Sequence, residues 1–415
     1  MAPWVHQHFG PEGKVFPCCI AANDLQDNLG DLSNGDTLQQ IWNSSATQKL
    51  RSNMLSGVKS KICELCYKYE HINKKSSRQE FNEEFGKYIQ DVVNTSNEGE
   101  VKEFAVRSID FRFSNICNLT CRMCSPYFSS KWHAEGVKLG IANSQKNEGK
   151  SVVYPVEDFD TLWRQVEPML PALEKIHFAG GEPLMMEEHY RILECLIALG
   201  KFDVQISYNT NFSEFRYKKY DVIGFWKKLR NVSVCASLDG MGQRGEFMRK
   251  GISWDKIESN RRRMLAEVPH VNFQLTPTVS IMNVLHLPDF FASWVDRKLM
   301  TPDQINIYLL FEPYFYNIIN LPLYLKREVE KKYAGFFDDY VKKKFPDSVA
   351  RFVMGQFNTV LNHMNSAETF KEIGQAYSEF SFQSYNQSLD EMRGEKFAQI
   401  FPELKDLISE KSSSE

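Results

Sequence analysis

Three cysteines within a short stretch are the residues of this sequence best suited to chemistry. Cys117, Cys121 and Cys124 follow the spacing C-x3-C-x2-C. A [4Fe–4S] cluster normally takes four thiolate ligands. Three cysteines this close together can bind three irons and leave the fourth iron open to a small molecule. The alternatives are a zinc knuckle with a distant fourth ligand and three buried structural cysteines.

A turn with two glycines and a carboxylate comes later in the chain. Residues 175–178 have the pattern of a short buried strand, and Gly180, Gly181 and Glu182 come soon after it. Adjacent glycines let the backbone approach a ligand closely. Glu182 adds a carboxylate that could hydrogen-bond the ammonium group of a bound amino acid. Such a turn is weak evidence alone, but after the three cysteines it favours a small-molecule site.

Together these motifs resemble the radical S-adenosylmethionine (SAM) superfamily. In that superfamily SAM chelates the open iron, and a GGEP-type turn holds its amino group. The resemblance extends to a polar strand end at 209–211, an SLDG sequence at 237–240 and a following arginine. It implies that the cofactor-binding residues are Met123, Gly180, Gly181, Glu182, Asn209, Asn211, Ser237, Asp239 and Arg249.

Several of these residues also have an ordinary explanation. Asn209 or Asp239 could cap a turn, Met123 could pack in the core, and Arg249 could be a solvated surface charge. The resemblance implies instead that Met123 packs on the adenine and that Arg249 faces the SAM carboxylate. It assigns no catalytic residue beyond the cluster and the SAM site.

A second group of cysteines lies near the N-terminus. Cys18 and Cys19 are adjacent, and Cys63 and Cys66 form a C-x2-C pair. This segment resembles the SPASM/twitch modules that hold an auxiliary [4Fe–4S] cluster in many radical SAM enzymes that act on peptides. The related pattern opens with Cys-x-x-Pro-Trp, and here that cysteine would fall one residue before Met1. The module also precedes the core, whereas it follows the core in many members.

The sequence leaves several possible sets of ligands for this second site. Either the chain starts too late and has lost a ligand, or all four cysteines bind, or three bind and leave an open iron. Adjacent cysteines can both ligate only with awkward geometry, which favours a lost or substituted ligand. The alternative is a structural zinc site made by Cys19, Cys63, Cys66 and either His6 or His8.

The amino-acid composition and net charge narrow the class of protein to which the chain can belong. The 415 residues are 42% hydrophobic and 25% charged, with a net charge of -3. This balance is typical of a globular protein and gives no reason to expect nucleic acid as a partner. No apolar run approaches the ~20 residues that span a bilayer. Nine cysteines, an odd number, suit metal ligation in a reducing compartment, so we expect a cytoplasmic protein without a membrane partner.

Alternating strand and helix patterns predict an α/β fold. Six strand-like segments separated by helix-length segments indicate a parallel sheet, and the resemblance implies a partial (β/α)6 TIM barrel. We expect three domains: a cysteine-rich auxiliary module, the radical SAM core and a helical C-terminal region. Their ranges are 1–85, 105–312 and 313–415; the six strands are expected at 107–113, 175–178, 204–208, 232–236, 271–279 and 305–310, a polar loop at 136–154 and a disordered tail at 409–415.

The resemblance predicts a function. We expect an enzyme that cleaves SAM reductively and abstracts hydrogen from a peptide or protein side chain, giving an oxidative modification or a crosslink. It would use a [4Fe–4S] cluster with SAM, a second [4Fe–4S] cluster or zinc, and an electron donor such as a flavodoxin or ferredoxin. The alternatives are a radical SAM enzyme acting on a small molecule and a non-catalytic Fe–S or zinc binding protein.

Overall fold

The computed structural model describes residues 1–23, 27–71, 75–141, 150–366, 377 and 379–409. The expected loop at 136–154 and tail at 409–415 lie partly outside these residues. The chain forms two compact units, each built from several segments of the sequence. Unit 1 comprises Met1–Ile116, Val152–Asn209 and Arg216–Ser233, and unit 2 comprises Cys117–Ser151, Thr210–Phe215 and Val234–Glu415.

The largest sheet among the described residues has eight strands, in the order β12-β10-β7-β6-β4-β1-β2-β3. Parallel pairing joins β1 to β4, β4 to β6 and β6 to β7. This mixed α/β architecture is a partial TIM barrel with a helical C-terminal region, so the predicted fold class is confirmed. The strands are β1 (His6–Phe9), β2 (Lys14–Phe16), β3 (Gly30–Asp31), β4 (Ser108–Phe111), β6 (Lys175–Phe178), β7 (Gln205–Thr210), β10 (Asn231–Ala236) and β12 (Asn272–Leu275).

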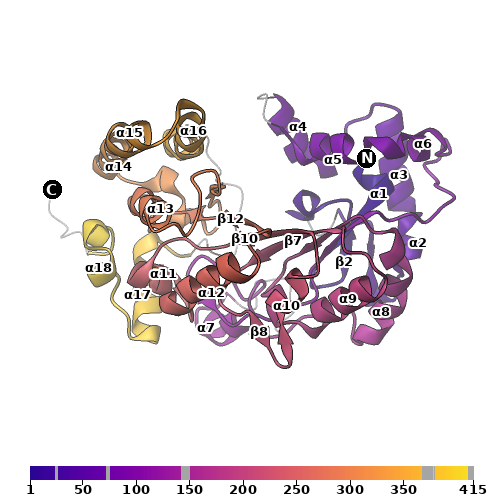
Figure 1. Cartoon of the computed structure of the whole chain (residues 1–415), viewed down its shortest axis with the longest axis horizontal. Helices are drawn as coiled ribbons and strands as arrows, with labels where there is room; N and C mark the ends of the chain where they lie inside the picture. Colours follow the sequence, from indigo (N-terminus) through magenta and orange to yellow (C-terminus); the bar gives the residue numbers. More distant parts are fainter. Residues whose placement is uncertain (24–26, 72–74, 142–149, 367–376, 378, 410–415) are drawn as a thin grey trace. The chain divides into compact units, whose positions relative to one another are not determined.

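One face of the sheet in unit 1 is an aromatic ladder. Phe9, Phe111, Phe178 and Tyr208 occupy matching positions on four neighbouring strands. Their ring centroids lie 5.4–5.7 Å apart from strand to strand. Since side chains alternate between faces along a strand, these residues share one side. Helices α8 (Phe159–Val166), α9 (Glu187–Ala198) and α10 (Val222–Trp226) lie on one side of the strands in Figure 1, and His189 of α9 packs edge-on against Phe178.

The opposite face of the same strands is polar although it is buried. His8 Nδ1 lies 3.0 Å from Asp110 Oδ2, and His177 Nδ1 lies 2.8 Å from Ser207 Oγ. His6 Nδ1 lies 2.8 Å from Ser108 Oγ. Burial raises the pKa of Asp110, but the neighbouring His8, Arg112 and His177 outweigh it and hold that pKa well below its usual range. Asp110 is therefore an ionised carboxylate inside the fold.

The N-terminal segment joins this sheet through β1, which pairs in parallel with β4. The hairpin of β1 and β2 places His8 opposite Phe16, directly before the first two cysteines. Apart from β3, the N-terminal elements that follow in the described residues are helical, and Thr37 and Ser76 each cap a helix with a capping box. These helices are α2 (Leu38–Trp42), α3 (Ser45–Leu55), α4 (Glu64–His71), α5 (Ser77–Phe85) and α6 (Ile89–Val93).

Unit 2 departs from the expected strand pattern at its last two strands. The segment 271–279 is not one strand, because β12 ends at Leu275 and β13 (Thr278–Val279) begins after Pro277. Proline has no N–H for a ladder hydrogen bond, which explains the interruption. The segment 305–310 contributes a single parallel bridge from Ile305 to Leu275 and the short strand β14 (Tyr308–Leu309), which pairs in parallel with β13. The domain boundaries expected near 85, 105 and 312 stay predictions.

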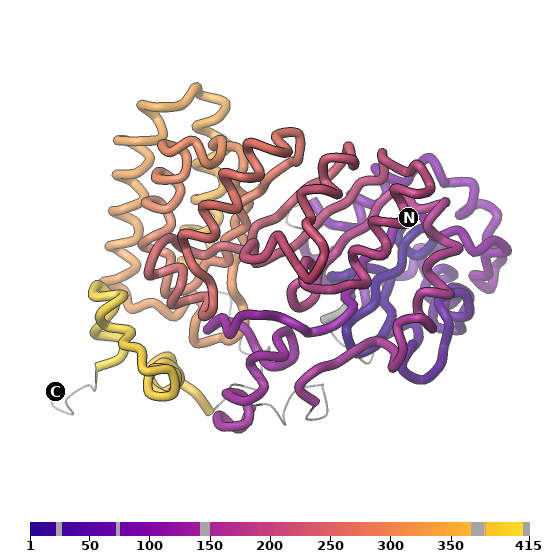
Figure 2. Tube along the Cα trace, turned by 60° about the horizontal axis from the view of Figure 1, so that its bottom comes forward, coloured from indigo at the N-terminus to yellow at the C-terminus, as the bar shows by residue number. Residues whose placement is uncertain are grey.

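The C-terminal half of unit 2 is helical. Helix α14 (Leu323–Phe336) packs beside α16 (Asp347–Met364), as Figure 2 shows in orange. Phe291 of α13 (Leu287–Asp296) contacts Phe357 of α16 edge-on, with ring centroids 5.7 Å apart. The chain continues into α17 (Phe382–Arg393) and α18 (Phe397–Ile400), drawn in yellow. Helix α17 contacts the loop that contains Cys117, Cys121 and Cys124.

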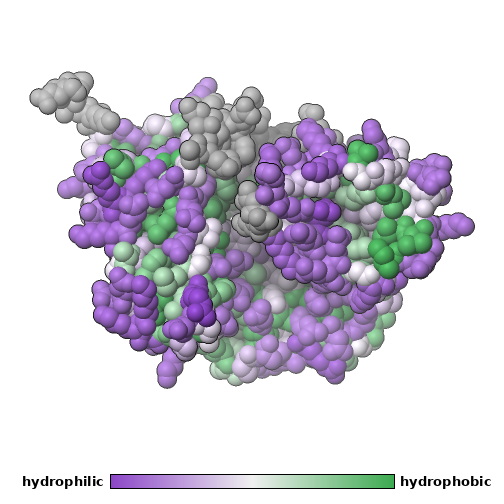
Figure 3. Space-filling view, turned by 90° about the horizontal axis from the view of Figure 1, so that it is seen from above, coloured by the Kyte–Doolittle hydropathy of each residue, from purple (hydrophilic) through white to green (hydrophobic). Residues whose placement is uncertain are grey.

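The face drawn in Figure 3 is mostly hydrophilic, with small hydrophobic groups scattered over it. Within the described part of the chain, no helix has the length and apolar character needed to span a membrane.

His189 is buried against the aromatic face, and we expect it to make the stability of the fold depend on pH. Burial lowers the pKa of His189 to about 3, whereas an unfolded histidine titrates near ~6.5. The unfolded chain therefore binds the extra proton, and the stabilisation present above pH ~6.5 is lost as the pH falls. We expect His189→Gln to reduce the slope of unfolding free energy against pH between 6 and 4 by about 1.4 kcal/mol per pH unit.

Urea unfolding at several pH values measures this slope. His270→Gln is the matched control, because His270 is exposed. An equal slope in the wild type and in His189→Gln would contradict the prediction.

Candidate metal centre and cofactor site

The three cysteines of the C-x3-C-x2-C motif lie close together in unit 2. Cys121 belongs to β5 (Thr120–Cys121), which pairs antiparallel with β11 (Arg249–Lys250). The Cys124 N–H donates to the Cys121 carbonyl at 2.9 Å, which turns the chain between them. Burial raises the pKa of the Cys124 thiol, and the nearby Cys121 and Cys117 raise it further. The thiols are thus near enough to influence one another.

Two side chains direct N–H groups at these sulfurs. Asn211 Nδ2 lies 3.8 Å from Cys117 Sγ, and Arg249 Nη1 lies 3.8 Å from Cys121 Sγ. An N–H donor favours a thiolate over a thiol, and a cationic donor does so more strongly. Arg249 accordingly lowers the pKa of Cys121, although burial leaves that pKa raised overall. Asn211 and Arg249 therefore face the cysteines from two sides.

The donor set fits an iron–sulfur cluster. Among the described residues, no three His, Cys, Asp or Glu side chains are grouped to hold one metal ion. A single tetrahedral ion with metal–sulfur bonds of ~2.3 Å needs sulfur atoms about 3.8 Å apart. A cluster needs no such group, because each thiolate binds its own iron. Buried thiols with N–H donors beside them suit that arrangement, since such donors tune cluster sulfur.

The SLDG turn holds Arg249 in place. Arg249 Nε lies 2.7 Å from Asp239 Oδ2, and Asp239 Oδ1 accepts from the Thr278 N–H at 2.9 Å. Burial lowers the pKa of Arg249, but the Asp239 charge outweighs it and raises the pKa overall. The Ser237 N–H donates to the Thr210 carbonyl at 2.8 Å. Arg249 is therefore a fixed cation beside Cys121.

Side chains from other segments donate hydrogen bonds to the backbone carbonyls of the cysteine loop, and the sequence motifs did not predict these donors. Four successive carbonyls, those of residues 118–121, each accept a hydrogen bond from a side chain. Only Thr120 and Cys121 of this loop lie in a ladder, that of β5 with β11, so the carbonyls of the loop need further partners from elsewhere. The donors, in order, are Lys131 Nζ at 3.0 Å, Ser129 Oγ at 2.6 Å, Arg393 Nη2 at 2.9 Å and Trp132 Nε1 at 2.8 Å.

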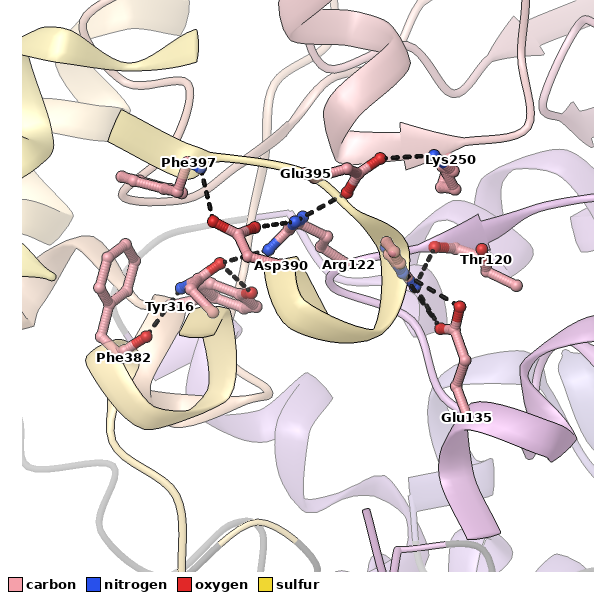
Figure 4. Close-up of polar contacts among 11 residues, drawn as sticks. Thr120, Arg122, Glu135, Lys250, Tyr316, Phe382, Asp390, Glu395 and Phe397 are labelled. Atoms are coloured by element: carbon pink, nitrogen blue, oxygen red, sulfur yellow. Dashed lines mark hydrogen bonds and ion pairs between the residues drawn. The ribbon is translucent and has the colours of Figure 1, made fainter. Parts of the chain in front are cut away.

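Arg122 lies between two of the cysteines and is fully buried. It pairs with Asp390 and Glu395, as Figure 4 shows, and donates to Asn386 Oδ1 at 2.9 Å. Its guanidinium lies 3.8 Å from the ring centroid of Phe247. Nothing in the sequence pattern predicted these contacts, because the carboxylates come 268 and 273 residues later.

The glycine–glutamate turn belongs to unit 1. Gly180 has a φ of +109°, which favours glycine. The Gly181 N–H donates to the Ser114 carbonyl at 3.0 Å, and the Glu182 N–H to the Ile116 carbonyl at 2.7 Å. Glu182 is fully buried, and its Oε1 accepts from the Leu184 N–H at 3.2 Å. The turn is thus bound tightly to the segment that precedes the cysteine loop.

The predicted cofactor residues fall into two groups. Unit 2 brings Asn211, Asp239 and Arg249 together with the cysteines, and it also contains Met123 and Ser237, both half-buried. Unit 1 holds Gly180, Gly181, Glu182 and Asn209, and Asn209 is exposed on β7.

The N-terminal cysteines do not share one environment. Burial has the largest effect on the pKa of Cys18 and raises it, and Cys19 and then Cys66 raise it further. Burial also raises the pKa of Cys63, and Cys66 raises it further. Cys18, Cys63 and Cys66 are therefore near one another, and Cys19 is near Cys18. The pKa of Cys19 is raised first by burial and then by Asp110, while Arg112 lowers it. Cys19 therefore lies nearer the polar face of the sheet.

The two histidines considered as zinc ligands lie on β1. His6 interacts with Ser108 and also packs against Phe81, with ring centroids 4.9 Å apart. His8 forms the buried pair with Asp110.

A substitution in the glycine–glutamate turn tests how tightly it is packed. A Cβ on Gly181 would lie 2.1 Å from the Ile116 carbonyl oxygen, so the backbone must move. We expect Gly181→Ala to cost about 1–3 kcal/mol of unfolding free energy, as overpacking does. The control Gly224→Ala in α10 meets nothing within 4 Å, and we expect it to stabilise by about 0.5–1 kcal/mol. Equal urea midpoints for the two variants would contradict this.

Two family patterns match the sequence. The pattern described as the radical SAM superfamily matches residues 111–282, which include the cysteine loop, the glycine–glutamate turn and the SLDG turn. The SPASM pattern, described as an iron–sulfur cluster-binding domain, matches residues 1–67. These two matches indicate binding of SAM and of iron–sulfur clusters. No curated protein matches the sequence.

Solved structures with some similarity include native anSMEcpe with bound AdoMet and Cp18Cys peptide. It is 17% identical, with a TM-score of 0.39, and the match covers 57% of this chain and 60% of that one. Streptococcus suis SuiB bound to S-adenosylmethionine is 12% identical, with a TM-score of 0.37 and coverage of 73% and 62%. The match thus spans less than two thirds of either structure.

The cysteine loop and the glycine–glutamate turn lie within the radical SAM match. The chain therefore contains a radical SAM domain at residues 111–282, preceded by a SPASM iron–sulfur cluster-binding domain at residues 1–67.

Proposed function

We propose that this protein is a radical SAM enzyme that modifies a peptide or protein side chain by hydrogen abstraction. When bound, the cluster and SAM supply the chemistry: one electron splits SAM into methionine and a 5′-deoxyadenosyl radical, which takes a hydrogen atom from the substrate. The observation that carries the proposal is the three-cysteine loop, in which Cys121 is buried and N–H donors lie beside Cys117 and Cys121.

The cysteine loop would hold the cluster. Cys117, Cys121 and Cys124 would each bind one iron, with Asn211 and Arg249 donating to two of the sulfurs. No fourth cysteine lies in the loop, so one iron would stay open for SAM. Because burial raises the pKa of Cys124, cluster binding must displace its proton.

The remaining motif residues would position SAM. Glu182 is a buried carboxylate beside two glycines whose backbone packs closely against residues 114–116, and it would accept hydrogen bonds from the amino group. Arg249 would attract the carboxylate, and Met123 would pack on the adenine. Asn209, Asn211, Ser237 and Asp239 would complete the site around the ribose and the strand ends.

The N-terminal module would hold a second cluster. Cys18, Cys63 and Cys66 lie near one another, which supports them as ligands. Cys19 is near Cys18 but also near Asp110 and Arg112, and it is exposed, so it is the weaker candidate. A fourth ligand would then come from outside this trio, or the iron would stay open. A zinc ion bound by Cys19, Cys63, Cys66 and His6 or His8 is the alternative.

The SPASM match supports a peptide substrate, because such modules accompany peptide modification in this superfamily. A small-molecule substrate is the second candidate, and a non-catalytic Fe–S or zinc binding protein is the third. The electron would come from a reduced flavodoxin or ferredoxin. A reducing cytoplasm would keep the nine thiols available. The functional regions would be 1–85, 105–312 and 313–415.

Removing one thiol of the cysteine loop tests the activity. We expect Cys124→Ala to form no 5′-deoxyadenosine from SAM under dithionite, because a cluster held by two thiolates is lost or misplaced. Cys195→Ala, on helix α9, is the matched control and should keep the wild-type rate. Anaerobic chromatography of the products measures both. Undiminished 5′-deoxyadenosine from Cys124→Ala would refute the proposed mechanism.

Metal analysis tests the N-terminal module. After anaerobic reconstitution we expect about eight irons and eight sulfides per chain, which correspond to two [4Fe–4S] clusters. Cys66→Ala should lower the iron content to about four while leaving SAM cleavage measurable. About four irons and one zinc in the wild type would instead identify the module as a structural zinc site.

A further inference from the structure

We infer that helix α17 is a positioning element for the cluster loop, residues 117–124, and that it acts through Arg122. The inference rests on the proposed function, because it concerns the loop that would hold the SAM cluster. The residues of α17 and the turn after it that contact the loop are called the C-terminal clamp: Asn386, Asp390, Arg393 and Glu395.

The first arm of the clamp holds the Arg122 side chain. Arg122 has no exposed surface, and its partners Asp390 and Glu395 have side chains only 15% and 14% exposed. The Glu395 contact is 2.8 Å long. A buried guanidinium needs such partners, because an unpaired charge inside a protein is strongly unfavourable. Phe247 covers the guanidinium from one side.

The second arm reaches the backbone of the loop. Arg393 Nη2 donates to the Thr120 carbonyl at 2.9 Å and pairs with Glu135. The Arg393 guanidinium also lies 5.1 Å from the ring centroid of Trp132, whose Nε1 donates to the Cys121 carbonyl. Two successive loop carbonyls thus depend on this arm.

The third arm ties the clamp to the strand beside the loop. Glu395 Oε1 lies 2.7 Å from Lys250 Nζ, while its other oxygen pairs with Arg122. Lys250 is paired with Thr120 in the β5–β11 ladder. The carboxylates of Asp390 and Glu395 therefore form ion pairs with two cations, Arg122 and Lys250, and the two negative charges balance the two positive charges.

The position of Arg122 in the sequence makes the clamp relevant to the cluster. Arg122 follows Cys121 directly and precedes Cys124 by two residues. A shift of its backbone must move both sulfurs, because the chain between them is short. Three irons of one cluster require three sulfurs at fixed separations, so holding Arg122 holds two of the three.

The test removes the negative charges without changing shape. Asp390→Asn with Glu395→Gln keeps the side-chain volumes but leaves Arg122 buried without a counter-charge. Hydrogen–deuterium exchange of the full-length, metal-free protein reports on the peptide 117–126. We expect its exchange to rise at least tenfold, while peptides of β6 and β7 stay unchanged. Glu391→Gln is the matched control, since Glu391 is exposed on the same helix.

Two further readouts concern the loaded protein. After reconstitution, the double variant should bind half as much core-cluster iron or less, and the electron paramagnetic resonance spectrum of its reduced cluster should no longer change when SAM is added. Wild-type exchange at 117–126 together with a wild-type spectrum would overturn the inference.

A folding defect and a failure of the proposed function give different results. If the double variant loses its cooperative thermal transition, the single variant Glu395→Gln is tested in its place. Exchange of the peptide 117–126 is then measured again, and a rise of at least tenfold is again expected. Wild-type protein that binds no iron would defeat the proposed function but not the inference, because exchange of the metal-free protein still decides whether α17 holds the loop.

Discussion

The cluster loop depends on hydrogen bonds that it cannot make by itself. Residues 117–124 contain only a two-residue strand, so most of their carbonyls have no ladder partner. Side chains from the following segment and from α17 supply the missing donors to the carbonyls of residues 118–121. An irregular backbone is fixed only where such partners surround it. The arrangement of the sulfurs thus reflects contacts made far from the cysteines in the sequence.

Charge balance is the second constraint on this region. Arg122, Arg249 and Arg393 all lie within or beside the loop, and each pairs with a carboxylate: Arg122 with Asp390 and Glu395, Arg249 with Asp239, and Arg393 with Glu135. Losing one partner of a buried pair typically costs about 3–5 kcal/mol, because the other charge stays unpaired. These pairs specify the local arrangement more than they stabilise the fold, since burying two charges is itself unfavourable.

The sequence predicted the strands that have a simple alternating or apolar pattern. The strands expected at 107–113, 175–178, 204–208 and 232–236 correspond to β4, β6, β7 and β10. It missed the break at Pro277, where apolar residues continue on both sides and conceal the lost donor. It placed the cysteines and the SLDG turn in one site, and the structure brings Arg249 to Cys121. The partners of Arg122 left no periodic signal, because an ion pair between residues 268 positions apart depends on the whole fold.

The pairing of β1 with β4 has a consequence for how the protein is made. His6 lies beside Ser108 in a parallel ladder, so the first strand needs a partner that is synthesised about a hundred residues later. At ~5–20 residues per second a ribosome takes several seconds to reach it. Contacts of such long sequence separation also form slowly. During this interval the first cysteines have only the local strands β1, β2 and β3 to join, and their thiols are accessible to metal ions before β4 is made.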